Sequence, residues 1–159
     1  MTAEETIQQQ LAGKFPFLAD KIRVQRVRRI WAETPAEHFD EVFKYLVEEL
    51  HFPMLCALTG LDEGATFGLL YHLAQENGIT LHLKVAIPRE KPVWKSVISF
   101  FPGNELCERE VADLFGVTFE GLPPGMRYPL HDNWPADEYP LRKDWKPKHE
   151  LAAAGEVAS

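Results

Sequence analysis

The chain is poor in the residues from which covalent frameworks and metal centres are built. Its 159 residues include only two cysteines, Cys56 and Cys107, which lie too far apart to suggest a disulfide framework. There is no Cys-x-x-Cys or His-x-x-x-His pair. Ligand spacing is normally evident in proteins that hold zinc or iron–sulfur clusters, so we predict no metal and no cofactor in this chain. His72 and His82 fall on neighbouring predicted strands and can face each other, but a polar sheet face accounts for both.

Phosphate-binding and membrane-spanning segments are also missing. Neither a Gly-x-Gly-x-x-Gly nor a Walker-type Gly-Lys-Ser/Thr sequence occurs. No apolar run approaches the roughly 20 residues of a membrane span, and no charged-then-apolar leader opens the chain. The net charge of −7 argues against nucleic acid and against direct electrostatic attraction to a membrane. We therefore expect a cytosolic chain that binds no nucleic acid.

What is present is the pattern of one α+β domain, beginning with two helices. Capping boxes at residues 2–5 and 34–37 predict a first helix over residues 3–11 and a second, strongly amphipathic helix. Between them, the basic segment 21–33 predicts one strand with a charged face. Its arginines stand at positions 23, 26, 28 and 29.

Three period-2 runs between residues 54 and 87 predict antiparallel strands, with a hairpin turn at Asn77-Gly78. A short strand over 97–101 follows, and then a helix from Asn104 to Phe115 with Gly116 as its left-handed C-cap. The fold class that we predict is α+β, as a two-layer domain over residues 1–119. Its sheet is mainly antiparallel, with helices packed on one face.

Beyond residue 119 the periodicity stops. Proline removes backbone donors and disfavours regular structure, so residues 120–150 are predicted to form an extended, proline- and aromatic-rich docking arm. Residues 151–159 are predicted to be a disordered tail. Aromatic side chains and arginine are enriched at the cores of interfaces, which favours an arm that a neighbouring protein covers. The alternative is an arm that wraps its own domain.

The densest set of charges lies in the predicted helix that ends at Phe115. Glu110 borders its apolar side, so we expect that carboxylate to turn toward the interior. We predict that Arg127 or Arg142 of the arm pairs with Glu108 or Glu110. An acid–base dyad of the two glutamates is the catalytic alternative, but no nucleophile, metal or pocket motif accompanies it. We therefore expect no active site in this chain alone; a free regulatory module is a further alternative.

The predicted helix contains the ordered motif Glu108-Arg109-Glu110-x-x-Asp113-Leu114-Phe115-Gly116, and the arm contains Pro140-Leu141-Arg142-Lys143-Asp144. With these motifs the sequence resembles the 30 kDa subunit family of complex I, the proton-pumping NADH:quinone oxidoreductase. The similarity covers about residues 39–146. It departs at Tyr139, where complex I members commonly have histidine, and the chain ends soon after residue 147, whereas they often continue. The motif residues, which are also our interface candidates, are Glu108, Arg109, Glu110, Asp113, Phe115, Gly116, Arg127, Trp134, Leu141, Arg142, Lys143 and Asp144.

This resemblance implies a non-catalytic subunit of the peripheral arm, without a redox centre of its own. It would dock and stabilise the redox subunits for electron transfer from NADH to quinone. The implied partners are a large hydrogenase-like subunit and a small iron–sulfur subunit, with a ferredoxin-like subunit as a further candidate. The implied location is the cytoplasmic face of the cell membrane, reached only through the complex. The alternative host is an energy-converting nickel–iron hydrogenase or formate hydrogenlyase.

Overall fold

The computed structural model describes residues 1–147. The predicted tail, 151–159, and the last residues of the predicted arm lie outside the described residues. Within the described part, no helix is both long and apolar enough to cross a membrane. The helices are α1 (Ala3–Lys14), α2 (Phe39–Glu48) and α3 (Glu105–Phe115). The strands are β1 (Ile22–Arg26), β2 (Arg29–Glu33), β3 (Met54–Asp62), β4 (Thr66–Ala74), β5 (Thr80–Pro88), β6 (Val93–Lys95) and β7 (Thr118–Glu120).

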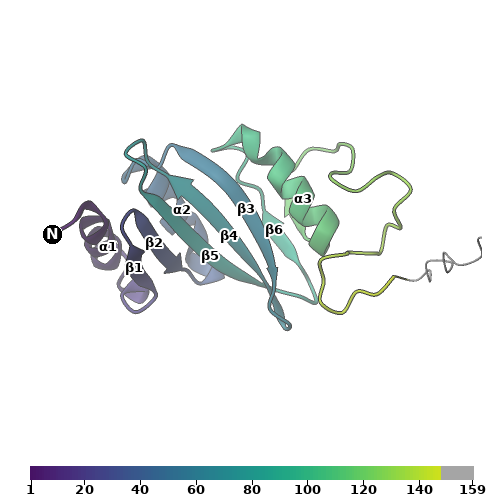
Figure 1. Cartoon of the computed structure of the whole chain (residues 1–159), viewed down its shortest axis with the longest axis horizontal. Helices are drawn as coiled ribbons and strands as arrows, with labels where there is room; N and C mark the ends of the chain where they lie inside the picture. The colour runs from purple at the N-terminus through teal and green to yellow at the C-terminus, as the bar shows by residue number, and fades with distance from the viewer. Residues whose placement is uncertain (148–159) are drawn as a thin grey trace, which may run out of the picture.

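Five strands form one mixed sheet in the order β1-β2-β5-β4-β3. Only the β2–β5 pair in this sheet is parallel, and the other pairs are antiparallel. Strands β6 and β7 form a separate parallel pair. Figure 1 shows α2 behind the five strands and α3 beside β3. The predicted two-layer α+β domain with a mainly antiparallel sheet and helices on one face is confirmed.

The core lies between the sheet and α2. Along β5 the residues Leu81, Leu83, Val85 and Ile87 are buried and alternate with half-buried ones, as the period-2 pattern predicts. The helix contributes its predicted stripe, with Phe39, Val42, Phe43 and Leu46 fully buried. We call the opposite side of the sheet the outer face. In Figure 1 it is turned to the viewer, and no helix crosses it.

The capping box at Thr2 is confirmed, but the one at Thr34 is wrong. Thr2 accepts a hydrogen bond from the backbone N–H of Glu5, and Glu5 accepts one from the N–H of Thr2. The Thr34 hydroxyl instead donates to the carbonyl of Pro35, a 3₁₀ turn occupies Ala36–His38, and α2 begins only at Phe39. The competing local hydrogen bond thus delays the helix by several residues.

Two predicted strands are also wrong. Segment 21–33 is a hairpin of β1 and β2, joined through Val27 and Arg28, and Arg28 adopts a φ of 59°. Such a turn usually contains glycine or asparagine, so this segment carries no turn signal. Segment 97–101 is not a strand, because the N–H of Val97 donates to the buried carboxylate of Glu108 instead of to a neighbouring strand. The short strand lies earlier, at Val93–Lys95.

Candidate functional site

Helix α3 lies directly against strand β3, and the contact depends on Gly60. A Cβ atom at this position would lie 2.6 Å from the ring of Phe115. The same phenylalanine packs edge-on against Phe67 of β4, with ring centroids 6.0 Å apart. The last turn of α3 is therefore fixed to the end of the sheet, and Gly116 ends the helix with a φ of 75°, as predicted.

The carboxylate that turns inward is Glu108, not Glu110. Glu108 is completely buried, whereas Glu110 is exposed. The side chain of Glu108 accepts hydrogen bonds from the N–H of Val97 at 2.8 Å and from the amide of Asn104 at 3.1 Å. Glu108 thereby fixes the segment after β6 to α3. Glu108 lies three residues before Val111 and seven before Phe115, both of which are buried, so it belongs to the apolar stripe of the helix. This spacing can be read from the sequence and indicates that Glu108 turns inward.

The surroundings of Glu108 contain no cation within ion-pair distance among residues 1–147. Its second carboxylate oxygen and the amide oxygen of Asn104 are buried without a hydrogen-bond partner in this part of the chain. Burial raises the pKa of Glu108, and hydrogen bonds from its neighbours only partly oppose this. The nearby hydroxyl of Tyr71 accepts a hydrogen bond from the indole of Trp94 at 3.1 Å, and burial raises its pKa as well.

Glu108→Gln is expected to make the free energy of unfolding less dependent on pH. Because the folded pKa lies above the ordinary value of 4.5, the native carboxyl stabilises the fold most below pH 4.5, and this contribution is lost as the pH rises through the raised pKa. The amide keeps an acceptor for Val97 and Asn104 but carries no charge. At pH 8 the variant should be more stable than the native chain by about 1 kcal/mol, measured by urea unfolding. The exposed Glu110→Gln is the control and should change stability by less than about 0.5 kcal/mol.

The arm, which we define as residues 121–147, contains neither helix nor strand. It contacts α3 at Arg109, Asp113 and Phe115. Arg109 donates to Glu105 at 2.7 Å and to the carbonyl of Pro123 at 2.7 Å. The backbone of Gly125 passes so close that a Cβ atom there would overlap the Arg109 guanidinium. Arg109 therefore connects the helix to the beginning of the arm.

The predicted pairing of arm arginines with Glu108 or Glu110 is wrong. Arg127 binds Asp113 instead, with Nε 3.0 Å from Oδ1, and its Nη1 donates to the carbonyl of Trp134 at 2.6 Å. The other oxygen of Asp113 accepts from the N–H of Leu130 at 3.2 Å. The Glu108 carboxylate accepts hydrogen bonds from backbone and amide donors inside the domain. The carboxylate of α3 that binds the arm is that of Asp113, which lies more than one helical turn further along the helix.

The end of the arm is held by a second group, which we call the Asp62 cluster: Asp62, Arg89, Arg142, Lys143 and Asp144. The side chain of Asp62 is only 2% exposed. It accepts from Arg89 Nη1 at 2.7 Å, from the N–H of Lys143 at 2.7 Å and from the N–H of Gly64 at 2.9 Å. Arg89 also reaches Asp144, at 2.5 Å. The hydrogen bond from Arg89 holds the pKa of the Asp62 carboxyl well below its usual range, and the backbone donors act in the same direction.

Arg142 completes the attachment without a carboxylate. Its Nε donates to the carbonyl of Phe115 at 2.7 Å, where α3 leaves that carbonyl without a helical partner. Its guanidinium lies 4.3 Å from the ring centroid of Tyr139 and 5.1 Å from that of Phe67. Arg89 lies 4.9 Å from the same Phe67 ring, so two cations share one aromatic ring. Burial lowers the pKa of Arg142, and the charge of Arg89 lowers it further.

The aromatic side chains of the arm partly cover one another. The indole of Trp134 donates to the carbonyl of Glu138 at 2.8 Å, and that of Trp145 donates to the Glu138 carboxylate at 3.2 Å. Other apolar side chains are exposed to solvent. Leu106 on α3 is 54% exposed, and Met126 and Leu141 on the arm are 78% and 52% exposed. The arm thus contacts its own domain and also leaves apolar surface beside it.

The structure brings the predicted residues together in two places. Arg109, Asp113, Arg127 and Trp134 meet over the middle of α3, and Phe115, Gly116, Leu141, Arg142, Lys143 and Asp144 meet at its end. Sequence reasoning missed Asp62 and Arg89 as members of the site. A signal for Asp62 exists, because Leu58-Thr59-Gly60-Leu61-Asp62 matches the resembled family in order and spacing. Arg89 has no such signal.

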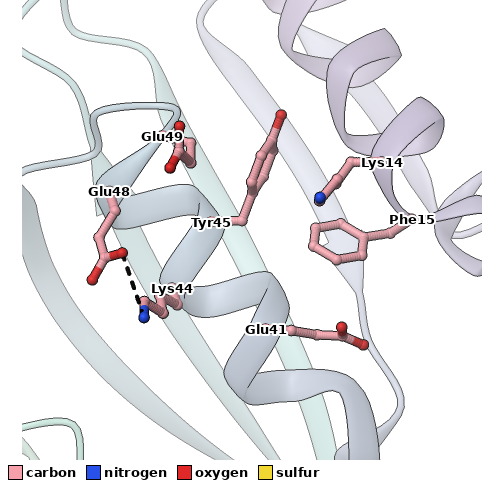
Figure 2. Close-up of a pocket in the computed structure, with 7 residues that line it drawn as sticks. All are labelled: Lys14, Phe15, Glu41, Lys44, Tyr45, Glu48 and Glu49. Atoms are coloured by element: carbon pink, nitrogen blue, oxygen red, sulfur yellow. Dashed lines mark ion pairs between the residues drawn. The ribbon is translucent and has the colours of Figure 1, made fainter.

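A groove also lies between the end of α1 and helix α2. Figure 2 shows its lining, and its volume is about 290 Å³. Phe15 and Tyr45 contact each other edge to face at 5.4 Å, and Lys44 and Glu48 form an ion pair at 3.8 Å. The rim mixes lysines with glutamates and holds no nucleophile beside a base. Across residues 1–147, no group of three or more potential metal-binding side chains occurs.

Comparison with known proteins gives one consistent result. The family described as respiratory-chain NADH dehydrogenase, 30 kDa subunit, matches residues 32–150. The chain is 33% identical to the C subunit of the F420H2 dehydrogenase of Methanosarcina mazei, over 89% of this chain and 90% of the relative. It is 27% identical to the beta subunit of the membrane-bound hydrogenase of Pyrococcus furiosus, over 92% and 88% of the two chains.

A third relative is much longer than this chain. The C/D subunit of the NADH-quinone oxidoreductase of Phocaeicola vulgatus is 39% identical over 71% of this chain, which spans only 22% of that protein. Among solved structures, a chain of the membrane-bound sulfane sulfur reductase, an archaeal respiratory membrane complex, superposes with a TM-score of 0.78. The two are 31% identical, and the match covers 89% of this chain and 85% of the other.

Proposed function

The chain belongs to the 30 kDa subunit family of respiratory-chain NADH dehydrogenase, and on this premise we propose that it is a non-catalytic peripheral subunit of a membrane-bound oxidoreductase complex. Its relatives are named as subunits of such complexes. The observation that carries the proposal is the arm, which is attached to α3 and to the end of β3 by ion pairs and hydrogen bonds. Beside these attachments, Leu106, Met126, Tyr128 and Leu141 remain exposed.

This arrangement suits docking better than chemistry. Glu108 is held by structural hydrogen bonds, and Asp113 and Asp62 are occupied by arginines and backbone donors. The Glu108 carboxylate therefore fixes the inside of the domain, and the carboxylates of Asp113 and Asp62 hold the arm in one conformation. An arm that is already ordered loses little conformational entropy when a partner covers it, and this favours binding. We propose that the arm and the exposed side of α3 dock on a large hydrogenase-like subunit and a small iron–sulfur subunit, with a ferredoxin-like subunit as a further neighbour.

Within the complex, the chain would hold no cofactor and would stabilise the subunits that carry electrons. It would lie at the cytoplasmic face of the membrane, attached only through its partners. The host that we propose is an NADH:quinone oxidoreductase, as the family description suggests. An energy-converting hydrogenase or formate hydrogenlyase is the alternative, because the match to the P. furiosus hydrogenase extends over nearly the whole of both chains.

Truncation after Leu122 tests the docking role of the arm. The cut lies beyond β7, so the sheet, the three helices and the β6–β7 pair all remain in the shortened chain. We expect the shortened chain to fold, as shown by circular dichroism and a cooperative melt. Because the docking surface is removed, it should no longer co-purify with other subunits when it replaces the native chain in its host.

The full-length chain with the same affinity tag is the control. It should elute only with a species much larger than itself. If the folded, truncated chain still assembles as well as the control, the arm is not the docking element.

A further inference from the structure

A continuous row of side chains crosses the outer face of the five-stranded sheet. Strand pairing places Arg23 opposite Trp31, Trp31 beside His82, and His82 opposite His72. Thr59 continues the row on β3, where its hydroxyl lies 3.0 Å from His72 Nε2. The members of the row on β2, β5 and β4 alternate with buried residues of the same strands, so the row lies on the outer face. No helix crosses that face (Figure 1), and the row is not part of the arm or of α3.

Neighbouring members of the row contact one another. The Arg23 guanidinium lies 5.8 Å from the ring centroid of Trp31, and the Trp31 and His82 rings are 6.4 Å apart. The facing Nδ1 atoms of His72 and His82 are 2.6 Å apart, so the predicted meeting of the two histidines is confirmed. The outer face therefore presents flat aromatic surface beside positive charge, a combination enriched in protein interfaces.

Three arginines in this row or beside it have no carboxylate to neutralise them. Arg23, Arg26 and Arg29 form no ion pair with any part of the chain that the structure describes, although acidic residues outnumber basic ones by 24 to 17. Lys84, on the same face, is neutralised by Glu63 at 2.6 Å and lies near Glu33 at 3.8 Å. The positive charge is thus confined to the β1–β2 side of the face.

Two of these arginines stand directly opposite each other. Strand pairing places Arg26 of β1 beside Arg29 of β2, and like charges in this position destabilise a sheet. The positive electrostatic potential of these two arginines extends along the row as far as His82. Burial and the neighbouring His72 lower the pKa of His82, and Arg29 and Arg26 lower it further. A local cost of this kind would be relieved by a carboxylate supplied from another molecule.

We propose that Arg23, Arg26, Arg29 and Trp31 form a second docking surface, which binds an acidic surface of a partner subunit. Charge complementarity selects this occupant, because carboxylates would neutralise the opposed arginines while an apolar neighbour would bury them unpaired. This second docking surface rests on the proposed function only because it requires a partner subunit. It does not involve the arm, so either docking surface can fail without the other.

Arg26→Glu in the full-length chain distinguishes an effect on the stability of the chain from an effect on its assembly with partner subunits. The variant replaces a like-charge pair by an opposite-charge pair, so the isolated chain should melt at the same or a higher temperature. In the host, recovery of partner subunits with the tagged variant should fall by about tenfold, and more at low salt than at high salt. Lys44→Glu, which changes the charge equally on α2, is the matched control and should leave recovery unchanged.

A zero-length cross-link identifies the partner group. The double variant Arg26→Lys, Arg29→Lys keeps the charge and supplies amines, which a water-soluble carbodiimide joins only to carboxylates in contact with them. In the assembled complex we expect a cross-link from position 26 or 29 to an aspartate or glutamate of another subunit. Cross-links from native lysines elsewhere in the complex control for the reaction.

Three results would overturn the proposal. The first is unchanged recovery with Arg26→Glu. The second is the lack of any cross-link at positions 26 and 29 while native lysines react. The third is binding of the isolated chain to phosphatidylserine–phosphatidylcholine vesicles in a flotation assay, if Arg26→Glu abolishes that binding. The surface would then bind lipid headgroups and not a protein.

Discussion

Gly116→Ala is expected to release the arm from α3 while the α+β domain stays folded. A Cβ atom at position 116 would lie 2.5 Å from the guanidinium of Arg142 and 2.7 Å from the ring of Tyr139. Both side chains belong to the arm, so the overlap is relieved by moving the arm and not by unfolding the core. The hydrogen bond from Arg142 to Phe115 would be lost with it.

The size of this effect follows from the lost charged hydrogen bond, which contributes about 2–3 kcal/mol. The released arm should therefore be populated roughly a hundredfold more than in the native chain. Trypsin cleavage within residues 123–147 measures this population, and co-purification of partner subunits should decline in parallel.

Gly78→Ala, in the turn between β4 and β5, is the matched control for the backbone. Gly78 has a φ of 83°, similar to that of Gly116, but its added Cβ would meet only the side chain of Arg28, at an ordinary contact distance of 3.7 Å. It should cost only the strain of a left-handed residue, about 1 kcal/mol, without faster cleavage of the arm. Equal cleavage rates for the two variants would show that the contact at Gly116 does not hold the arm.

Asp62→Asn is expected to lower the free energy of unfolding by about 3 kcal/mol and to detach residues 141–147. The carboxylate accepts from Arg89 with one oxygen and from the N–H of Lys143 with the other. An asparagine amide has one acceptor oxygen, and its nitrogen only donates, so at least one of these partners would lose its hydrogen bond. Arg89 would also lose its buried counter-charge. Asp40→Asn, which affects an exposed ion pair with Lys95, should cost less than about 1 kcal/mol.

The same variant should change how stability responds to acid. Because the pKa of Asp62 is held below its ordinary value of 3.8, the carboxylate stabilises the folded state above that value, and the contribution is lost as the pH falls toward the lowered pKa. The difference in unfolding free energy between native chain and variant should therefore be greatest near neutral pH and should shrink below about pH 4. A constant difference from pH 7 to pH 2 would show that Asp62 does not act through its charge.

The sequence allowed prediction of those elements that depend on local patterns. The stripe of α2 from Phe39 to Leu46, the alternation along β5 and the left-handed Gly116 all follow from periodicities or conformational preferences of nearby residues. The β1–β2 hairpin could not be predicted in this way, because its connection, Val27-Arg28, contains none of the residues that usually mark a turn.

The long-range pairs of the site were beyond local patterns. Asp62 and Lys143 are 81 positions apart, and nothing in the charge pattern tells which of several arginines reaches which carboxylate. Glu108 is different, because its place on the apolar stripe of α3 was available from spacing alone. The prediction that Glu110 turns inward is wrong, because Glu110 does not share the three- and seven-residue spacing to Val111 and Phe115.

Amide hydrogen exchange of residues 123–147, compared between the isolated chain and the complex purified from its host, tests the docking role of the arm most directly. We predict that exchange in this segment slows strongly in the complex, while the buried strands β4 and β5 exchange equally in both. Equal exchange of the arm in the two samples would contradict the account, because it would mean that no partner covers this surface.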